Sequence, residues 1–155
     1  MDATSFENLD LVVGSFHSAL RKKEDQTERY LSGLENPFIH ILGHPRGRIY
    51  NYRIGLNADW PKVFLRAAEL GKAVEIDSFP DRQDLNVQLL QIAKKAHCLI
   101  AIDTDAHHPW QLDFAEYGLA AALKAGIDPK QIINFYDVPG LKELFAVRTN
   151  RQGGE

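Results

Sequence analysis

The sequence predicts an α/β fold in which about five parallel strands alternate with helices. Short apolar runs typical of buried strands alternate along the chain with longer segments whose apolar residues recur at helical spacing. No low-complexity linker or obvious repeat interrupts this alternation. The length of 155 residues suits one domain, and the alternation favours a parallel sheet with right-handed crossovers. Periodicity leaves open whether this sheet is open or part of a barrel.

Two predicted strands have the clearest composition, an apolar run at 98–103 and an alternating segment at 73–77. In the second, alternation places Glu75 and Asp77 on one face. An unpaired carboxylate in a buried sheet is costly, so each must meet a cation, a hydrogen-bond network or water. A polar site lined by Glu75 and Asp77, a buried pair with Arg82 and an exposed edge strand would each explain them. The other predicted strands are 9–14, 38–43 and, most weakly, 131–135.

Helix start and stop signals are strongest in the second predicted helix. Asp59 is placed as its N-cap, Pro61 lies in its first turn and Gly71 follows its end. Gly126 ends the fourth predicted helix. We expect a single domain over 1–148 and a flexible tail over 149–155. The predicted helices are 25–35, 60–70, 87–97, 111–125 and 139–146.

The composition is that of an average soluble protein, with 45% hydrophobic and 25% charged residues. The net charge of −3 gives no overall attraction for nucleic acid or an anionic membrane, although a local basic patch is compatible with it. The single cysteine, Cys98, excludes a disulfide framework and fits a reducing compartment. Without a long apolar run or a signal-peptide pattern, we expect a soluble, cytoplasmic protein.

Three of the predicted strands end in a histidine or an Asp-x-His pair. Asp105 and His107 follow the strand at 98–103, His44 follows 38–43 and His17 follows 9–14. The carboxyl ends of parallel strands meet at one edge of the sheet, where α/β folds place their chemistry. Mixed oxygen and nitrogen ligands without cysteine suit a divalent cation. Each residue alone could instead be part of a turn or cap, so the metal hypothesis depends on the three strand ends together.

The long loop at 45–57 contains arginine and glycine residues directly after His44. Arg46 and Arg48 could bind a phosphate bidentately, or could simply be solvated arginines of a surface turn. The sequence contains no Gly-rich phosphate loop and no CxxC motif, and nothing indicates a Ser-His-Asp triad.

Four motifs in order resemble one known family. They are Val13-Gly14-Ser15-Phe16-His17-Ser18, Ile41-Leu42-Gly43-His44-Pro45-Arg46-Gly47-Arg48, the segment from Val74 to Leu85, and Asp103-Thr104-Asp105-Ala106-His107. With these motifs the sequence resembles the polymerase and histidinol phosphatase (PHP) domain over about residues 8–145. The most similar form is the one attached to bacterial family X DNA polymerases.

The resemblance implies a distorted (β/α) barrel that holds a cluster of divalent ions at its strand ends and hydrolyses phosphoesters. Zinc or manganese is the expected metal, with magnesium or iron as alternatives. By motif match, the implied metal ligands are His17, His44, Asp105 and His107. The implied phosphate-binding or site-stabilising groups are Arg46, Arg48 and Arg82. Glu75 and Asp77, which strand alternation places on one face, would line the same site.

The family's first motif, His-x-His on the first strand, has no counterpart in this sequence. We therefore expect a truncated, PHP-like (β/α) barrel with a reduced metal site. The chain would then be a metal-dependent phosphoesterase, or a non-catalytic metal- or phosphate-binding or assembly module. The open edges of a partial barrel favour association, either as a homodimer that completes the core or with a separately encoded partner. Neither a membrane nor nucleic acid is expected as a tight partner.

Overall fold

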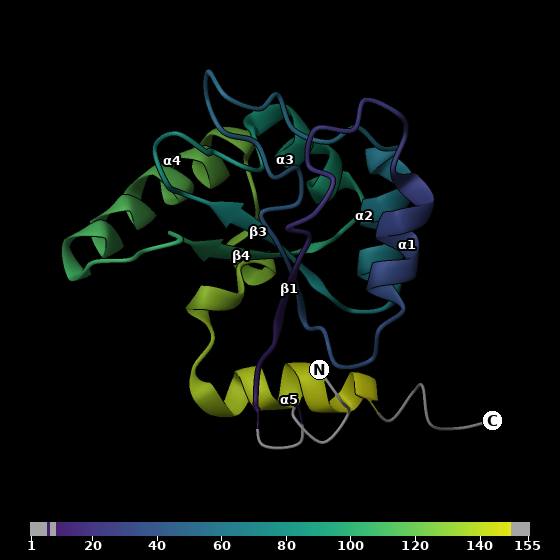
Figure 1. Ribbon diagram of the computed structural model, residues 1–155. Coiled ribbons are helices and arrows are strands. Elements are labelled where there is room, and N and C mark those ends of the chain that lie inside the picture. Colours follow the sequence, from purple (N-terminus) through teal and green to yellow (C-terminus); the bar gives the residue numbers. More distant parts are fainter. Residues whose placement is uncertain (1–5, 7–8, 150–155) are drawn as a thin grey trace.

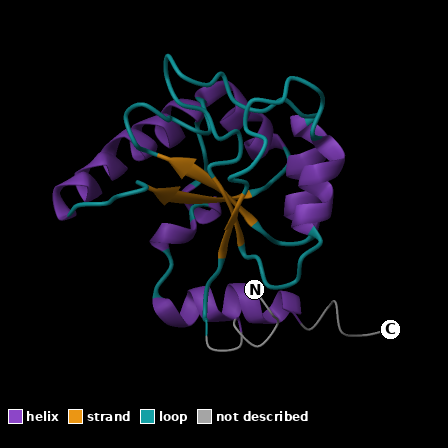
Figure 2. Cartoon of the chain, viewed as in Figure 1, coloured by secondary structure: helices purple, strands orange, loops and turns teal. Residues whose placement is uncertain are grey.

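The computed structural model describes residue 6 and residues 9–149 of the chain. It confirms the α/β class: a four-stranded, all-parallel sheet in the order β1-β2-β3-β4 alternates with helices (Figure 1, Figure 2). The sheet order follows the chain order, as expected for successive right-handed crossovers. The strands are β1 (Val13–Ser15), β2 (Ile41–Gly43), β3 (Ala73–Asp77) and β4 (Leu99–Asp103).

The helices lie close to their predicted positions, and their ends follow the predicted capping signals. Asp59 Oδ1 accepts a hydrogen bond from the Lys62 N–H at 3.1 Å, and Gly126 ends α4 in the left-handed conformation at φ 70°. The predicted helix 111–125 is divided, because a 3₁₀ helix, η2 (Pro109–Phe114), precedes α4. The helices are α1 (Thr27–Leu34), α2 (Trp60–Glu69), α3 (Val87–Lys95), α4 (Ala115–Ala125) and α5 (Val138–Thr149).

The two faces of the sheet are covered differently. Val74, Ile76 and Ile100 belong to the larger hydrophobic core, together with buried residues of α1 to α4. On the other face a smaller core joins Ala73 at the start of β3 to Phe145 of α5, the helix that lies apart from the others below the sheet (Figure 1). This second core covers the beginnings of the strands, so their carboxyl ends on the same face are left for polar side chains.

The fifth predicted strand, residues 131–135, is not a strand in the structure. Two short 3₁₀ helices, η3 (Pro129–Gln131) and η4 (Ile133–Phe135), take its place, and only the pair Ile100–Ile132 forms a parallel bridge. Side-chain amides occupy the edge of β4 instead. Asn134 accepts from the N–H of Ile102 at 2.8 Å and donates to its carbonyl at 2.9 Å. These bonds satisfy backbone groups that another strand would have paired.

The first strand starts later than the predicted 9–14 because a side chain replaces part of its ladder. The N–H of Val12 donates to His40 Nδ1 at 3.1 Å, while the Val12 carbonyl accepts from the N–H groups of His40 and Ile41. His40 therefore has a structural role. The predicted flexible tail lies outside the described residues, apart from Thr149 at the end of α5. None of the helices described is long and apolar enough to cross a membrane.

Candidate metal centre

Three carboxylates gather at the carboxyl ends of β3 and β4. Asp77 and Asp103 are register partners, and Glu75 lies two residues before Asp77 on the same side of β3. The Glu75 carboxylate accepts a short hydrogen bond from the His44 N–H, and its side chain is hydrogen-bonded to Asp103. Burial raises the pKa of Glu75 to about 8 and that of Asp77 to about 6, and it also raises the pKa of Asp103. Such a group of desolvated acids favours a nearby cation or retained protons.

His44 and His17 lie next to one another at the ends of β2 and β1. Their rings are 5.1 Å apart between centroids and meet edge to face at 70°. Nδ1 of His44 is buried, and no other described residue hydrogen-bonds to it. Burial lowers the pKa of His44; a contact with its own backbone and the charge of Asp105 oppose this shift, while the charges of His17 and Arg82 add to it. The lowered pKa favours the neutral imidazole, which is the form that binds a metal ion.

Arg82 lies between the carboxylates of Asp77, at the end of β3, and Asp105, in the loop after β4. Its Nη2 is 3.3 Å from Asp105 Oδ2, and its Nη1 is 4.0 Å from Asp77 Oδ2. A pair with Arg82 was one of the explanations considered for a buried acid in β3, and the structure shows such a pair for Asp77. His107 is exposed, and its Nδ1 lies 2.7 Å from the Asp105 carbonyl. Gln111 is buried and accepts from the His107 N–H at 2.6 Å, which holds this turn in place.

The candidate ligands are gathered but do not converge on one point. Among the described residues, no three His, Cys, Asp or Glu side chains are arranged to hold a metal ion together. His17 and His44 are neighbours, and the charge of Asp105 acts on His44, whereas His107 contacts the Asp105 carbonyl. The types of donor fit zinc or manganese, since imidazole and carboxylate are ligands for both ions. The assignment of these four residues as metal ligands remains a prediction.

The two arginines after His44 donate hydrogen bonds to backbone carbonyls, one within their own loop and one in the loop after β3. Arg46 Nη2 donates to the Ile54 carbonyl at 2.8 Å, and Arg48 Nη1 donates to the Arg82 carbonyl at 2.7 Å. Their backbone N–H groups donate to Asp84 Oδ2 at 2.8 and 3.5 Å. Of the three arginines predicted to bind phosphate, Arg82 is the one whose side chain contacts the carboxylate cluster, through Asp77. The phosphate role of all three remains a prediction.

Three residues of this region were not assigned a role from the sequence: Asp84, Asp103 and Gln111. Asp84 is fully buried and anchors the loop after His44, and Gln111 anchors the turn at His107. Asp103 has a local signal, because it ends an apolar strand and lies two residues before Asp105. Neither Asp84 nor Gln111 has such a signal, since their partners are set by the folded loops.

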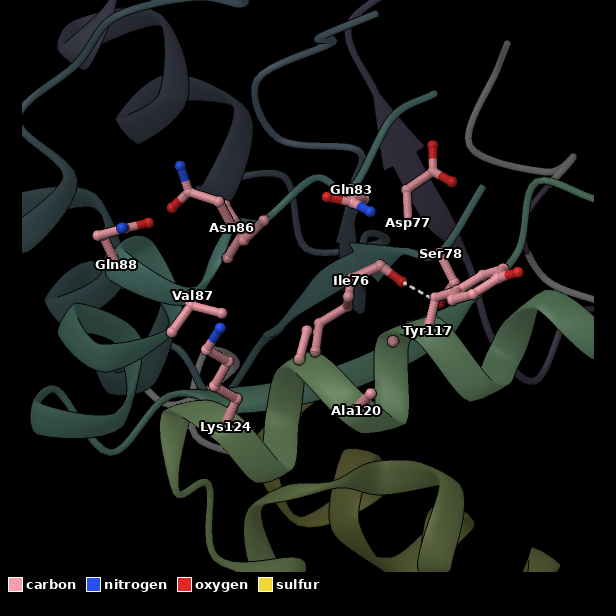
Figure 3. Close-up of a pocket in the computed structure, with 13 residues that line it drawn as sticks. Ile76, Asp77, Ser78, Gln83, Asn86, Val87, Gln88, Tyr117, Ala120 and Lys124 are labelled. Carbon is pink, nitrogen blue, oxygen red and sulfur yellow. Dashed lines mark hydrogen bonds between the residues drawn. The ribbon is translucent and has the colours of Figure 1, made fainter. Parts of the chain in front are cut away.

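A cavity of ≈ 390 Å³ lies beside β3 on the opposite, helix-covered side. Figure 3 shows Ile76 directed toward α4 and Asp77 directed away from it. Gly118 allows this close approach of α4, because a Cβ there would lie 2.1 Å from Ser78 Oγ. Asp77 of the carboxylate cluster is also among the residues that line this cavity, at the end of β3.

Comparison with known proteins agrees with these observations. No profile of a known protein family matches the chain. The chain is 31% identical over 127 residues to the DNA polymerase/3'-5' exonuclease PolX of Bacillus subtilis, an alignment that covers 81% of the chain and 22% of that protein. It is 31% identical over 159 residues to a probable phosphatase of Thermoanaerobacter sp. (strain X514), covering 96% of the chain and 62% of the relative. A probable phosphatase of Caldicellulosiruptor bescii is 28% identical over 138 residues, covering 84% of the chain and 55% of the relative.

The chain thus spans less than two thirds of the length of each of these relatives. The same relationship is indicated by the four motifs, by the parallel α/β fold and by the histidines and acids at its strand ends. The chain is related to PolX and to these probable phosphatases, as expected for a PHP-like domain.

Proposed function

We propose that this chain forms a PHP-like, metal-dependent phosphoesterase site with a reduced set of ligands. The observation that supports this most strongly is the environment of His44. Its buried Nδ1 receives no hydrogen bond from another described residue, His17 is its neighbour at the carboxyl edge of a parallel sheet, and the charge of Asp105 acts on it. His17, His44, Asp105 and His107 would hold the ion, zinc or manganese by preference.

The ion would supply Lewis-acid stabilisation of the phosphate and lower the pKa of a bound water. The remaining groups are suited to orienting the site. Glu75 fixes the backbone of His44, and Arg82 holds the Asp105 carboxylate while offering a guanidinium for phosphate oxygens. Desolvation by the surrounding strands strengthens these charge interactions.

His44→Asn is expected to abolish metal-dependent hydrolysis of a chromogenic aryl phosphate, with a loss of about 100-fold or more, because an amide is a poor substitute for imidazole. The matched control is His97→Asn. Both histidines have positive φ, 25° and 54°, and asparagine tolerates that conformation, but His97 is exposed at the end of α3. Rates with zinc or manganese against chelator give the measurement.

Hydrolysis that survives in His44→Asn would contradict the proposed site. If wild type and His97→Asn bind the metal, His44→Asn does not, and none of the three hydrolyses the substrate, the chain is the alternative considered from the sequence, a non-catalytic binding or assembly module. That alternative is supported by one observation: among the described residues, the candidate ligands do not point to a common position for a metal ion.

We also propose that the protein self-associates. Exposed apolar side chains lie at and before the edge strand β1, at Leu9, Leu11 and Val13, and a second group lies at Trp110 and Leu123 of η2 and α4. Exposed apolar groups of this kind at a sheet edge favour association. Light scattering at tens of micromolar is expected to give a dimer mass, and Leu11→Lys with Val13→Lys to give a monomer. A monomeric wild type at this concentration would refute the proposal.

A further inference from the structure

The proposed phosphoesterase site makes no use of the cavity between β3, α3 and α4, which we call the α3–α4 cavity. Its volume of ≈ 390 Å³ suits a small organic molecule. Ile76 and Leu85, each 1% exposed, supply the buried apolar part of its lining. Ala120 and Ala121 of α4 continue this apolar surface. The α3–α4 cavity can therefore cover the apolar body of a ligand.

One end of the α3–α4 cavity is suited to a negative charge. Of the described residues that line the cavity, Lys124 alone carries a positive charge, and it forms no salt bridge with a described carboxylate. Figure 3 shows Lys124 extended from α4 in the direction of Val87, the first residue of α3. The N–H groups of Val87 and Gln88 have no acceptor among the described residues, because the Asn86 side chain caps the N–H of Leu89 at 3.0 Å. An anion at this end would meet both the lysine and these donors.

The one acidic residue among the described lining residues, Asp77, does not oppose such an anion. Its side chain is directed away from α4 in Figure 3. Asp77 Oδ2 lies 4.0 Å from Arg82 Nη1, and Oδ1 accepts from the Phe79 N–H at 3.0 Å. Asp77 is thus paired on the side of the carboxylate cluster, and the charge that faces the cavity is that of Lys124.

The other end of the α3–α4 cavity is aromatic. Tyr117 and Lys124 stand two helical turns apart on α4, so both line the cavity at a separation of about 10 Å along the helix axis. Tyr117 is 53% exposed, its ring packs against Phe114 with 5.9 Å between centroids, and its hydroxyl forms no hydrogen bond with a described residue. Only the small side chains of Ala120 and Ala121 lie between Tyr117 and Lys124 on this side of the helix. An aromatic face and a cation at this separation fit a flat acid of two fused rings.

We propose that the α3–α4 cavity binds a small organic acid, with its carboxylate at Lys124 and the start of α3 and its apolar body against Tyr117 and the alanines of α4. An inorganic anion would leave the apolar lining uncovered, and a neutral apolar molecule would leave Lys124 without a partner. One lysine matches the single charge of a carboxylate, whereas a phosphate ester carries nearly two charges. Binding of the acid does not require a metal ion, so this proposal stands or falls separately from the proposed phosphoesterase function.

The test is a titration of the isotope-labelled full chain, followed by the NMR signals of its backbone amides, with a chelator present. The probe is 2-naphthoate, and the matched ligands are 2-naphthalenemethanol, which lacks the charge, and acetate, which lacks the apolar body. We expect saturable shifts from 2-naphthoate at residues 85–88 and 117–124, which border the cavity. The alcohol is expected to bind about tenfold more weakly, because it forms no charge-assisted hydrogen bond, and acetate is expected not to saturate in the millimolar range.

Two variants locate the ligand. Lys124→Met keeps the apolar stem of the side chain and is expected to weaken binding of 2-naphthoate about tenfold while leaving binding of the alcohol unchanged. Its matched control is Lys130→Met, which removes the same charge from an exposed residue of η3 that does not line the cavity. Ala120→Phe places a ring in the cavity from an exposed position of α4 and is expected to weaken binding of both naphthalene compounds about tenfold or more. The same spectra show whether each variant is folded.

The absence of saturable shifts with 2-naphthoate, or shifts that lie outside the residues bordering the cavity, would overturn the proposal. Unchanged affinity in folded Ala120→Phe would do the same, because the ligand would then lie elsewhere. Equal affinity for the acid and the alcohol, or equal losses in Lys124→Met and Lys130→Met, would overturn the assignment of an acid. A chain that binds 2-naphthoate as expected but does not hydrolyse aryl phosphate would refute only the proposed function.

Discussion

Glu75→Gln is expected to stabilise the metal-free protein at about pH 8.5 by on the order of 2 kcal/mol and to have little effect near pH 5. Burial raises the pKa of Glu75 to about 8, so the folded protein keeps this proton well above the usual range of a glutamate. The stability from this group is fully present below the pKa of the unfolded chain and is lost as pH rises through about 8. The pKa values of Asp77 and Asp84 shift in the same direction, since burial raises each of them to about 6.

Glutamine keeps the contacts of the protonated glutamate. Its carbonyl can accept from the His44 N–H and its amide can donate to Asp103, the two partners of Glu75. The measurement is the free energy of unfolding by urea at both pH values, with chelator present. We expect wild type to lose stability between them and Glu75→Gln to lose less. Parallel pH profiles for the two proteins would show that Glu75 does not retain its proton in the fold.

Asp84→Ala is expected to destabilise the protein by about 3 kcal/mol, because it leaves buried N–H donors without an acceptor. Asp84 is 1% exposed, and its Oδ2 accepts from the N–H of Arg46 at 2.8 Å and from that of Arg48 at 3.5 Å. These bonds fix the turn that follows His44. Asp84→Asn keeps one acceptor oxygen and should cost less.

The control for Asp84 is Asp113→Ala, an aspartate in the exposed part of η2 that is expected to change stability by less than about 0.5 kcal/mol. Urea unfolding of the three variants at neutral pH gives the comparison. If Asp84→Ala proves as stable as Asp113→Ala, Asp84 does not anchor the loop after His44.

The parts of the fold that follow from local pattern were predictable, and the parts set by side-chain pairing across the chain were not. β3 was predicted at its observed bounds, 73–77, because alternation and apolar content both mark it. β1 was predicted too early because nothing near Val12 indicates that His40, 28 positions later, will accept its N–H. The segment at 131–135 has strand-like composition, yet Asn134 satisfies the edge of β4 with its side chain.

The candidate site shows the same division. The rule that chemistry lies at the carboxyl ends of parallel strands brings His17, His44 and Asp105 to one region, as the structure does. Asp84 acts on Arg46, 38 positions away, through a pairing of loops that the sequence does not reveal. Likewise, the sequence did not reveal that the guanidinium groups of Arg46 and Arg48 donate to the backbone carbonyls of Ile54 and Arg82, and their phosphate role stays a prediction.

Isothermal titration of the metal-free protein with zinc or manganese at about pH 7.5 tests the central claim most directly, since neutral imidazole and ionised carboxylate both bind at this pH. We expect saturable binding close to one equivalent per chain, lost in His44→Asn and retained in His97→Asn. Absence of saturable binding, or equal binding by wild type and His44→Asn, would contradict a metal centre at these strand ends.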